Sequence, residues 1–140
     1  MIVSTIQVLL PWKIRQVWDA VTAVDQYPLW RSGLERVEVL SKAQFVEYTG
    51  SGFPTVFTTT VWEPCIRWEF DLDNSSMGGH WSGIFTERGA ETAVTFTEQV
   101  AVKKFYLRPI VKSYLRRQQK RFVSDLESFL MRQGSGALKI

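Results

Sequence analysis

Three side chains of this sequence are candidates for proton transfer: His80, Glu98 and Glu69. A general acid or base needs a pKa near the working pH and a position within about 3 Å of its proton. Glu98 shares strand parity with Val94 and Phe96, which favours an inward position where burial would raise its pKa. Glu69 has the parity of a solvent-facing residue. His80 follows two glycines at the predicted edge of a loop, which is typical of a surface residue.

Other catalytic patterns are missing from the sequence. It contains no legible Ser-His-Asp, Cys-His or paired-carboxylate arrangement and no phosphate-binding loop. The single cysteine, Cys65, excludes an internal disulfide and a multi-cysteine zinc site, and one histidine cannot build a His-rich metal centre. Cys65 has no apparent base beside it and is interpreted as a bystander. We expect no metal and no cofactor.

Gln118 is the most informative single position. It is a polar amide on an otherwise apolar stripe of a predicted helix, and an unpaired buried amide costs about 1–3 kcal/mol. Either a backbone group satisfies this amide, or the side chain faces a cavity and meets water or a ligand. In the second case, Gln118 joins Glu98 and His80 as a weak catalytic candidate.

The elements that must position these residues follow from hydropathy patterns. Residues 2–9 are rich in β-branched types and predict a strand, and residues 13–22 and 24–30 predict two short helices. Strand-like segments then follow one another at hairpin spacing, which favours antiparallel pairing. The segments are 34–40, 44–49, 54–62, 66–73, 80–87 and 92–102, with a loop at 74–79.

The chain ends in a predicted long helix, from about Leu107 to Arg132. Its apolar stripe comprises Val111, Tyr114, Leu115, Gln118, Phe122, Leu126 and Phe129. We expect one α+β domain at 1–132, in which a curved antiparallel sheet wraps around this helix. A flexible tail is expected at 133–140. A strongly bent sheet and a helix cannot meet along their full length, so a cavity is expected between them.

Basic charge is concentrated in one stretch. From Lys103 to Arg121 the chain carries eight basic residues and no acidic one, although the net charge of all 140 residues is only +3. This face of the helix is either an ordinary solvated surface or a contact for an anionic membrane or an acidic partner. The contact would use Lys112, Arg116, Lys120 and Arg121. Nucleic acid is not expected, because no recognition module accompanies the charge.

The order of elements and several motifs resemble the SRPBCC superfamily, the helix-grip group of START-type lipid-binding domains, polyketide cyclases and dehydratases, and Bet v 1 allergens. The resemblance covers residues 1 to about 131. It rests on Val17-Trp18-Asp19-Ala20-Val21, Asp25-Gln26-Tyr27-Pro28-Leu29-Trp30, Val37-Glu38-Val39, Trp62-Glu63-Pro64, Trp81-Ser82-Gly83-Ile84-Phe85-Thr86-Glu87 and Phe122-Val123-Ser124-Asp125-Leu126-Glu127. These motifs are structural, so the resemblance implies a fold and a ligand-binding habit rather than a reaction.

In such a fold the cavity is lined by the inner face of the sheet and by the inner stripe of the long helix. Aromatic residues make up 14% of the chain, more than a core of this size needs. The faces of strands 54–62 and 80–87 are ambiguous, and ordinary core is the alternative interpretation for every candidate. The candidate lining residues are Trp68, Phe70, Trp81, Phe85, Phe96, Tyr114, Leu115, Gln118 and Phe122, with Trp62 as a further ambiguous position.

Three functions are compatible with this sequence. The first is binding, with possible transport, of a small hydrophobic ligand such as a lipid or polyketide. The second is a cyclase or dehydratase that moves protons in the same pocket with Glu98 or Gln118 and a water. The third is a module that docks through its basic helix. Two or more ionisable groups converging in the cavity would favour the enzyme. We expect a cytoplasmic protein, because no signal sequence or span of about 18–20 apolar residues is present.

Overall fold

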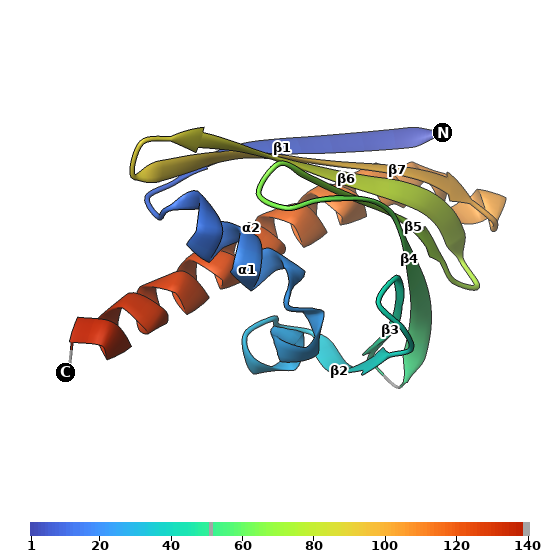
Figure 1. Ribbon diagram of the computed structural model, residues 1–140. Helices are drawn as coiled ribbons and strands as arrows, with labels where there is room; N and C mark the ends of the chain where they lie inside the picture. The colour runs from blue at the N-terminus through green and yellow to red at the C-terminus, as the bar shows by residue number, and fades with distance from the viewer. Residues whose placement is uncertain (51, 139–140) are drawn as a thin grey trace.

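The computed structural model describes residues 1–50 and 52–138. A seven-stranded sheet curves over a long C-terminal helix (Figure 1). Two short helices lie on the same side of the sheet as this long helix. The elements in chain order are β1 (Ile2–Leu10), α1 (Ile14–Thr22), η1 (Val24–Leu29), β2 (Leu34–Val39), β3 (Gln44–Thr49), β4 (Phe53–Glu63), β5 (Arg67–Asp73), β6 (Met77–Arg88), β7 (Glu91–Val102), η2 (Phe105–Leu107) and α2 (Arg108–Leu138). The predicted helix-grip fold is confirmed.

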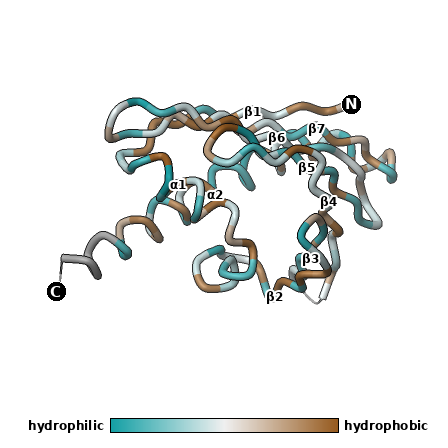
Figure 2. The backbone as a smooth tube through the Cα atoms, viewed as in Figure 1, coloured by the Kyte–Doolittle hydropathy of each residue, from teal (hydrophilic) through white to brown (hydrophobic). Residues whose placement is uncertain are grey.

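All strand pairs are antiparallel, and the strand order is β1-β7-β6-β5-β4-β3-β2. Six strands therefore follow one another as hairpins, while β1 joins β7 across most of the chain. Hydrophobic and hydrophilic residues alternate along the strands (Figure 2), and the apolar residues of β5 are the buried ones. Irregular pairing in β4, between Thr59 and Val61, interrupts the register where the sheet bends.

The core lies between the inner face of the sheet and the helices. It combines Val17, Trp18 and Val21 of α1 with Leu126 and Leu130 of α2 and with inward residues of the strands. Packing of their apolar faces in this core stabilises α1 and α2, because tertiary packing supplies most of the stability of helices in proteins. No helix in residues 1–50 and 52–138 is both long and apolar enough to cross a membrane.

Two boundaries differ from the prediction by more than one residue. The helix α2 continues through residues 133–138, past its predicted end at Arg132, and residues 139–140 of the predicted tail lie outside the described part. The strand β6 begins at Met77 rather than at His80, so Gly78 and Gly79 belong to a strand and not to a loop. Gly79 faces inward where a Cβ atom would collide with the carbonyl of Gln99, so glycine here permits close strand approach.

Candidate functional site: a ring-lined cavity with a polar end

A cavity of about 400 Å³ lies between the inner face of β3–β7 and the first half of α2. The rest of the space between the sheet and the helices is filled by the core, to which α1 contributes Val17, Trp18 and Val21. Side chains of Phe53, Ile110 and Tyr114 line the cavity and are partly exposed, so they mark its opening to solvent.

The wall formed by the sheet is a continuous set of aromatic rings. Phe45 stacks on Phe57 with ring centroids 4.8 Å apart, and Phe70 stacks on Trp81 at 4.7 Å. Phe57 and Phe70 meet edge to face and join the two stacks, and Trp68 packs against Phe70. Edge-to-face and offset pairs are the preferred aromatic geometries. The wall is therefore apolar and preorganised.

Most of the predicted lining residues are where the sequence analysis expects them. Trp68, Phe70, Trp81, Tyr114, Leu115, Gln118 and Phe122 all line the cavity. Phe85 and Phe96 do not: both point inward but lie in the solid core, where Phe85 packs on Trp18 and Phe96 on Phe122. Trp62 is half exposed and covers Trp18 from outside, so it is not a lining residue either.

One end of the cavity is polar. Arg31 donates to the Glu47 carboxylate over 2.7 Å, and its guanidinium lies over the rings of Tyr27 and Phe122. Burial acts to lower the pKa of Arg31, but the Glu47 carboxylate and Tyr27 outweigh it and the net change is a rise. Burial also raises the pKa of Tyr27 well above its usual range, so its hydroxyl stays protonated and donates to the Val21 carbonyl. Sequence reasoning missed Arg31 and Glu47.

Glu98 lines this end of the cavity from β7, and its register partner on β6 is Trp81. Within the described residues its carboxyl has no hydrogen-bond partner. Burial raises the pKa of Glu98 from 4.5 to about 7, nearby Glu47 raises it further, and Arg31 opposes both effects. A carboxyl group with this pKa exchanges a proton readily at neutral pH. The predicted inward orientation is thus correct.

The two adjacent glutamines of α2 have different roles. Gln118 lines the cavity and is only partly buried, and its Nε2 donates to the Tyr114 hydroxyl over 3.0 Å. Gln119 is the buried one: it accepts from Ser4 Oγ and donates to the carbonyls of Ser4 and Phe96. Gln119 therefore joins α2 to β1 and β7, a structural role that the sequence analysis had left open for Gln118.

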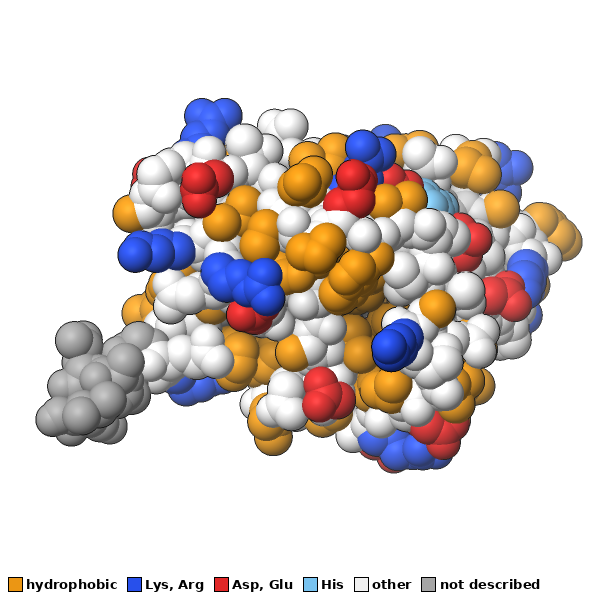
Figure 3. All heavy atoms as spheres, viewed as in Figure 1, with side chains coloured by type: hydrophobic (Ala, Val, Ile, Leu, Met, Phe, Trp, Pro, Cys, Tyr) orange, Lys and Arg blue, Asp and Glu red, His pale blue; other side chains and the backbone are white. Residues whose placement is uncertain are grey.

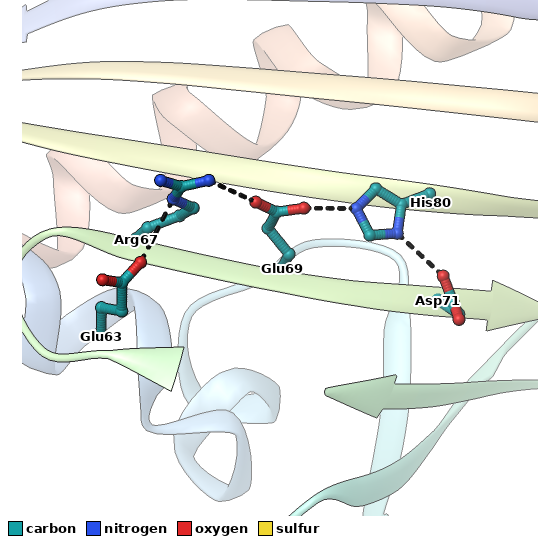
Figure 4. A network of polar contacts seen from close by, with 5 residues as sticks. All are labelled: Glu63, Arg67, Glu69, Asp71 and His80. Carbon is teal, nitrogen blue, oxygen red and sulfur yellow. Dashed lines mark hydrogen bonds and ion pairs between the residues drawn. The ribbon is translucent and has the colours of Figure 1, made fainter. Parts of the chain in front are cut away.

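His80 lies on the outer face of the sheet, away from the cavity (Figure 4). Its Nε2 is 2.7 Å from a Glu69 oxygen and its Nδ1 is 2.8 Å from an Asp71 oxygen, and Arg67 extends the network to Glu63. The hydrogen bond to Asp71 is the largest cause of a raised His80 pKa. His80 and Glu69 are thus paired with each other on the wet face and do not contribute to the cavity. In residues 1–50 and 52–138, no group of three or more His, Cys, Asp or Glu side chains is arranged to hold a metal ion.

Comparison with solved structures supports this fold assignment at low sequence identity. A START superfamily protein from Mycobacterium smegmatis superimposes with a TM-score of 0.86 at 13% identity, covering 94% of this chain and 98% of that one. The Zhui aromatase/cyclase from Streptomyces sp. R1128 gives a TM-score of 0.81 at 12% identity, with 94% of both chains covered. For the di-domain aromatase/cyclase BexL the TM-score is 0.72 at 12% identity, and the match covers 91% of this chain and 47% of that one.

No curated protein matches the sequence closely. A family profile, by contrast, matches residues 1–129, nearly the whole chain, and its description is polyketide cyclase / dehydrase and lipid transport. The chain therefore belongs to the polyketide cyclase/dehydrase and lipid transport family, within the SRPBCC superfamily that its motifs resemble.

Proposed function

We propose that this protein binds a small hydrophobic ligand, such as a lipid or a polyketide, in the cavity between the sheet and α2. The observation that carries this proposal is the cavity itself, about 400 Å³ in volume with a wall of aromatic rings. Ligand sites typically occupy about 300–1,000 Å³ and are mostly apolar with a few convergent polar groups. Family membership supports the same interpretation.

The polar end indicates which hydrophobic ligands fit. An unpaired carboxyl on Glu98, beside the Arg31–Glu47 ion pair, favours a ligand that carries a carbonyl or hydroxyl oxygen at one end. The protonated form of Glu98 can donate a hydrogen bond to such an oxygen. A purely hydrocarbon ligand would leave this carboxyl without a partner, which is unfavourable in a buried site.

Native mass spectrometry of the purified protein, followed by organic extraction, tests for a retained ligand. A binding assay with ANS, a fluorescent probe that has aromatic rings and an anionic sulfonate group, tests whether the cavity is the binding site. Gln118→Trp places a large ring in the cavity and is expected to weaken probe binding on the order of tenfold or more, a loss of about 1.4 kcal/mol. Ser113→Trp, on an exposed position of the same helix, is the matched control and should leave binding unchanged. Equal probe binding by both variants would contradict the proposal.

A second function, proton transfer of the cyclase or dehydratase type, is favoured by the convergence of ionisable groups in the cavity. As a carboxylate, Glu98 can accept a proton from a carbon beside a carbonyl group. As an acid, it can protonate a departing hydroxyl group, which then leaves as water. Arg31 lines the same end of the cavity, where its guanidinium would stabilise negative charge that develops on a ligand oxygen.

One experiment distinguishes proton transfer from simple binding. A synthetic poly-β-ketone thioester is incubated with the protein, and its cyclised or dehydrated products are quantified by mass spectrometry. Glu98→Gln is expected to lower turnover by about 10²–10⁴-fold, the usual contribution of a general acid or base, while ANS binding is kept. No turnover by the unaltered protein, or equal turnover by the variant, would leave binding as the function.

A further inference from the structure

Large apolar side chains are exposed beside the cavity opening. Phe105 and Tyr106 of η2 are 83% and 63% exposed, and Ile110 in the first turn of α2 is 60% exposed. Ile110 and the adjacent Leu107 also line the cavity. Exposed rings grouped at one end of a molecule are unusual for a soluble surface and mark an interaction site. We call Phe105, Tyr106 and Ile110 the apolar tip.

Most of the positive charge in the stretch that contains the apolar tip has no acidic partner within the described residues. In Figure 3 hydrophobic, basic and acidic side chains lie next to one another at the end of the molecule where η2 lies. Lys103 is neutralised by Asp73 at 2.6 Å. The other seven basic residues of this stretch form no ion pair within the described part of the chain. They are Lys104, Arg108, Lys112, Arg116, Arg117, Lys120 and Arg121.

Helical geometry places part of this charge on the same side as the opening. Ile110, Tyr114, Arg117 and Arg121 are spaced at i, i+4, i+7 and i+11, so they form one stripe along α2. The first three also line the cavity. Apolar and basic side chains thus follow the rim of the cavity from η2 along the first half of α2.

We call Lys104, Arg117 and Arg121 the basic stripe. We propose that the apolar tip and the basic stripe dock on an anionic phospholipid bilayer, with the cavity opening turned towards the membrane. Aromatic side chains favour the interface between headgroups and acyl chains, and each nearby Lys or Arg adds electrostatic attraction to anionic lipid. Charge of a single sign around protruding rings suits a fluid anionic surface, which needs no matched pattern of partners. Docking does not depend on the proposed binding function. A docked protein could also pass a ligand between the membrane and the cavity, and this step rests on the proposed binding function.

Sedimentation with vesicles tests the docking in the absence of any cavity ligand. The full chain is mixed with vesicles of phosphatidylcholine alone or of equal parts phosphatidylcholine and phosphatidylglycerol. Binding is expected only to the anionic vesicles and should weaken with added salt. Lys104→Gln combined with Arg117→Gln should weaken it on the order of 25-fold, about fivefold for each charge. Phe105→Ser combined with Tyr106→Ser should weaken it further.

Matched controls lie elsewhere on the surface. Lys42→Gln combined with Arg88→Gln removes two exposed charges, one between β2 and β3 and one at the end of β6, and Leu29→Ser removes a side chain that is 72% exposed on η1. Both controls should bind vesicles like the unaltered protein. Absence of vesicle binding, or equal losses in test and control variants, overturns the docking proposal and leaves the basic stripe to an acidic protein partner. Vesicle binding that persists in a protein unable to bind ANS would refute the proposed ligand function alone.

Discussion

The raised pKa of Glu98 has a direct consequence for stability. Its pKa is about 7 in the folded protein, against 4.5 for an unperturbed glutamate. Between these values the folded state holds a proton that the unfolded state has lost, so stability falls by about 1.4 kcal/mol per pH unit. The contribution is fully present below pH 4.5 and is lost as the pH rises through about 7. The full difference corresponds to about 3 kcal/mol.

Glu98→Gln removes this dependence, because glutamine resembles a protonated glutamate in shape and never ionises. At about pH 5 the variant and the unaltered protein should have similar free energies of unfolding, within about 1 kcal/mol. At about pH 8 the variant should be more stable by up to about 3 kcal/mol.

Urea unfolding, followed by the fluorescence of the six tryptophans, measures this difference across the pH range. Subtracting the two curves cancels every other titrating group. Glu38→Gln, at an exposed position of β2, is the matched control for the loss of a glutamate charge. If the Glu98→Gln difference does not change with pH, or if the variant is less stable at pH 8, Glu98 is not a desolvated carboxyl and the proton-transfer hypothesis loses its basis.

Two further predictions concern residues outside the aromatic wall. Gln119→Leu should lower the free energy of unfolding by about 1–3 kcal/mol because it leaves buried polar partners unpaired. Gln118→Leu should change the free energy of unfolding by less than about 0.5 kcal/mol and should alter ligand preference. Equal effects of the two variants in urea unfolding would contradict the structural role of Gln119. His80→Asn should destabilise the protein at about pH 6, where the charged imidazole pairs with Glu69 and Asp71, and this deficit should shrink as the pH rises through the raised pKa of His80. A deficit that grows with pH in the same assay would show that neutral His80 is the stabilising form.

The strands and their order are predictable from the sequence because alternation is a local signal. Trp68, Phe70 and Leu72 alternate with charged residues, and the structure buries those three and exposes or half-exposes the others. The start of β6 is not predictable from the sequence, because the role of its glycines depends on a contact that is not local. Gly79 is read locally as a loop signal, but its role depends on the neighbouring strand β7, where Gln99 and Val100 leave no room for a side chain.

The cavity is harder to predict than the fold. Phe85, Phe96 and Trp81 all point inward, yet of these three only Trp81 lines the cavity, because Trp18 of α1 packs on Phe85 and Phe122 of α2 packs on Phe96. Strand parity predicts the face of the sheet on which a side chain lies, but it does not predict which part of α2 lies opposite that side chain. The Arg31–Glu47 pair is also beyond local reasoning, since one residue follows η1 and the other lies in β3.

The two glutamines show a limit of the helical projection. The buried polar residue Gln119 interrupts the apolar residues of α2. A helical projection that follows Tyr114 and Phe122 therefore places Gln118, and not Gln119, in the centre of the buried face. The structure centres the buried face on Leu115, Gln119 and Leu126 instead. Only the partners of Gln119 on β1 and β7, which are distant in the sequence, reveal that its amide is satisfied.

The strand order also has a kinetic consequence. Strands β2 to β7 can assemble from neighbouring hairpins, but β1 pairs with β7 across most of the chain, with Ile2 opposite Val100. Closing so long a loop carries a high entropic cost before any contact rewards it, and such non-local pairing slows folding. Until β1 arrives, β7 is an open edge and Gln119 lacks its partner Ser4. A chain that has not yet made this closure therefore exposes the kind of edge through which sheets aggregate.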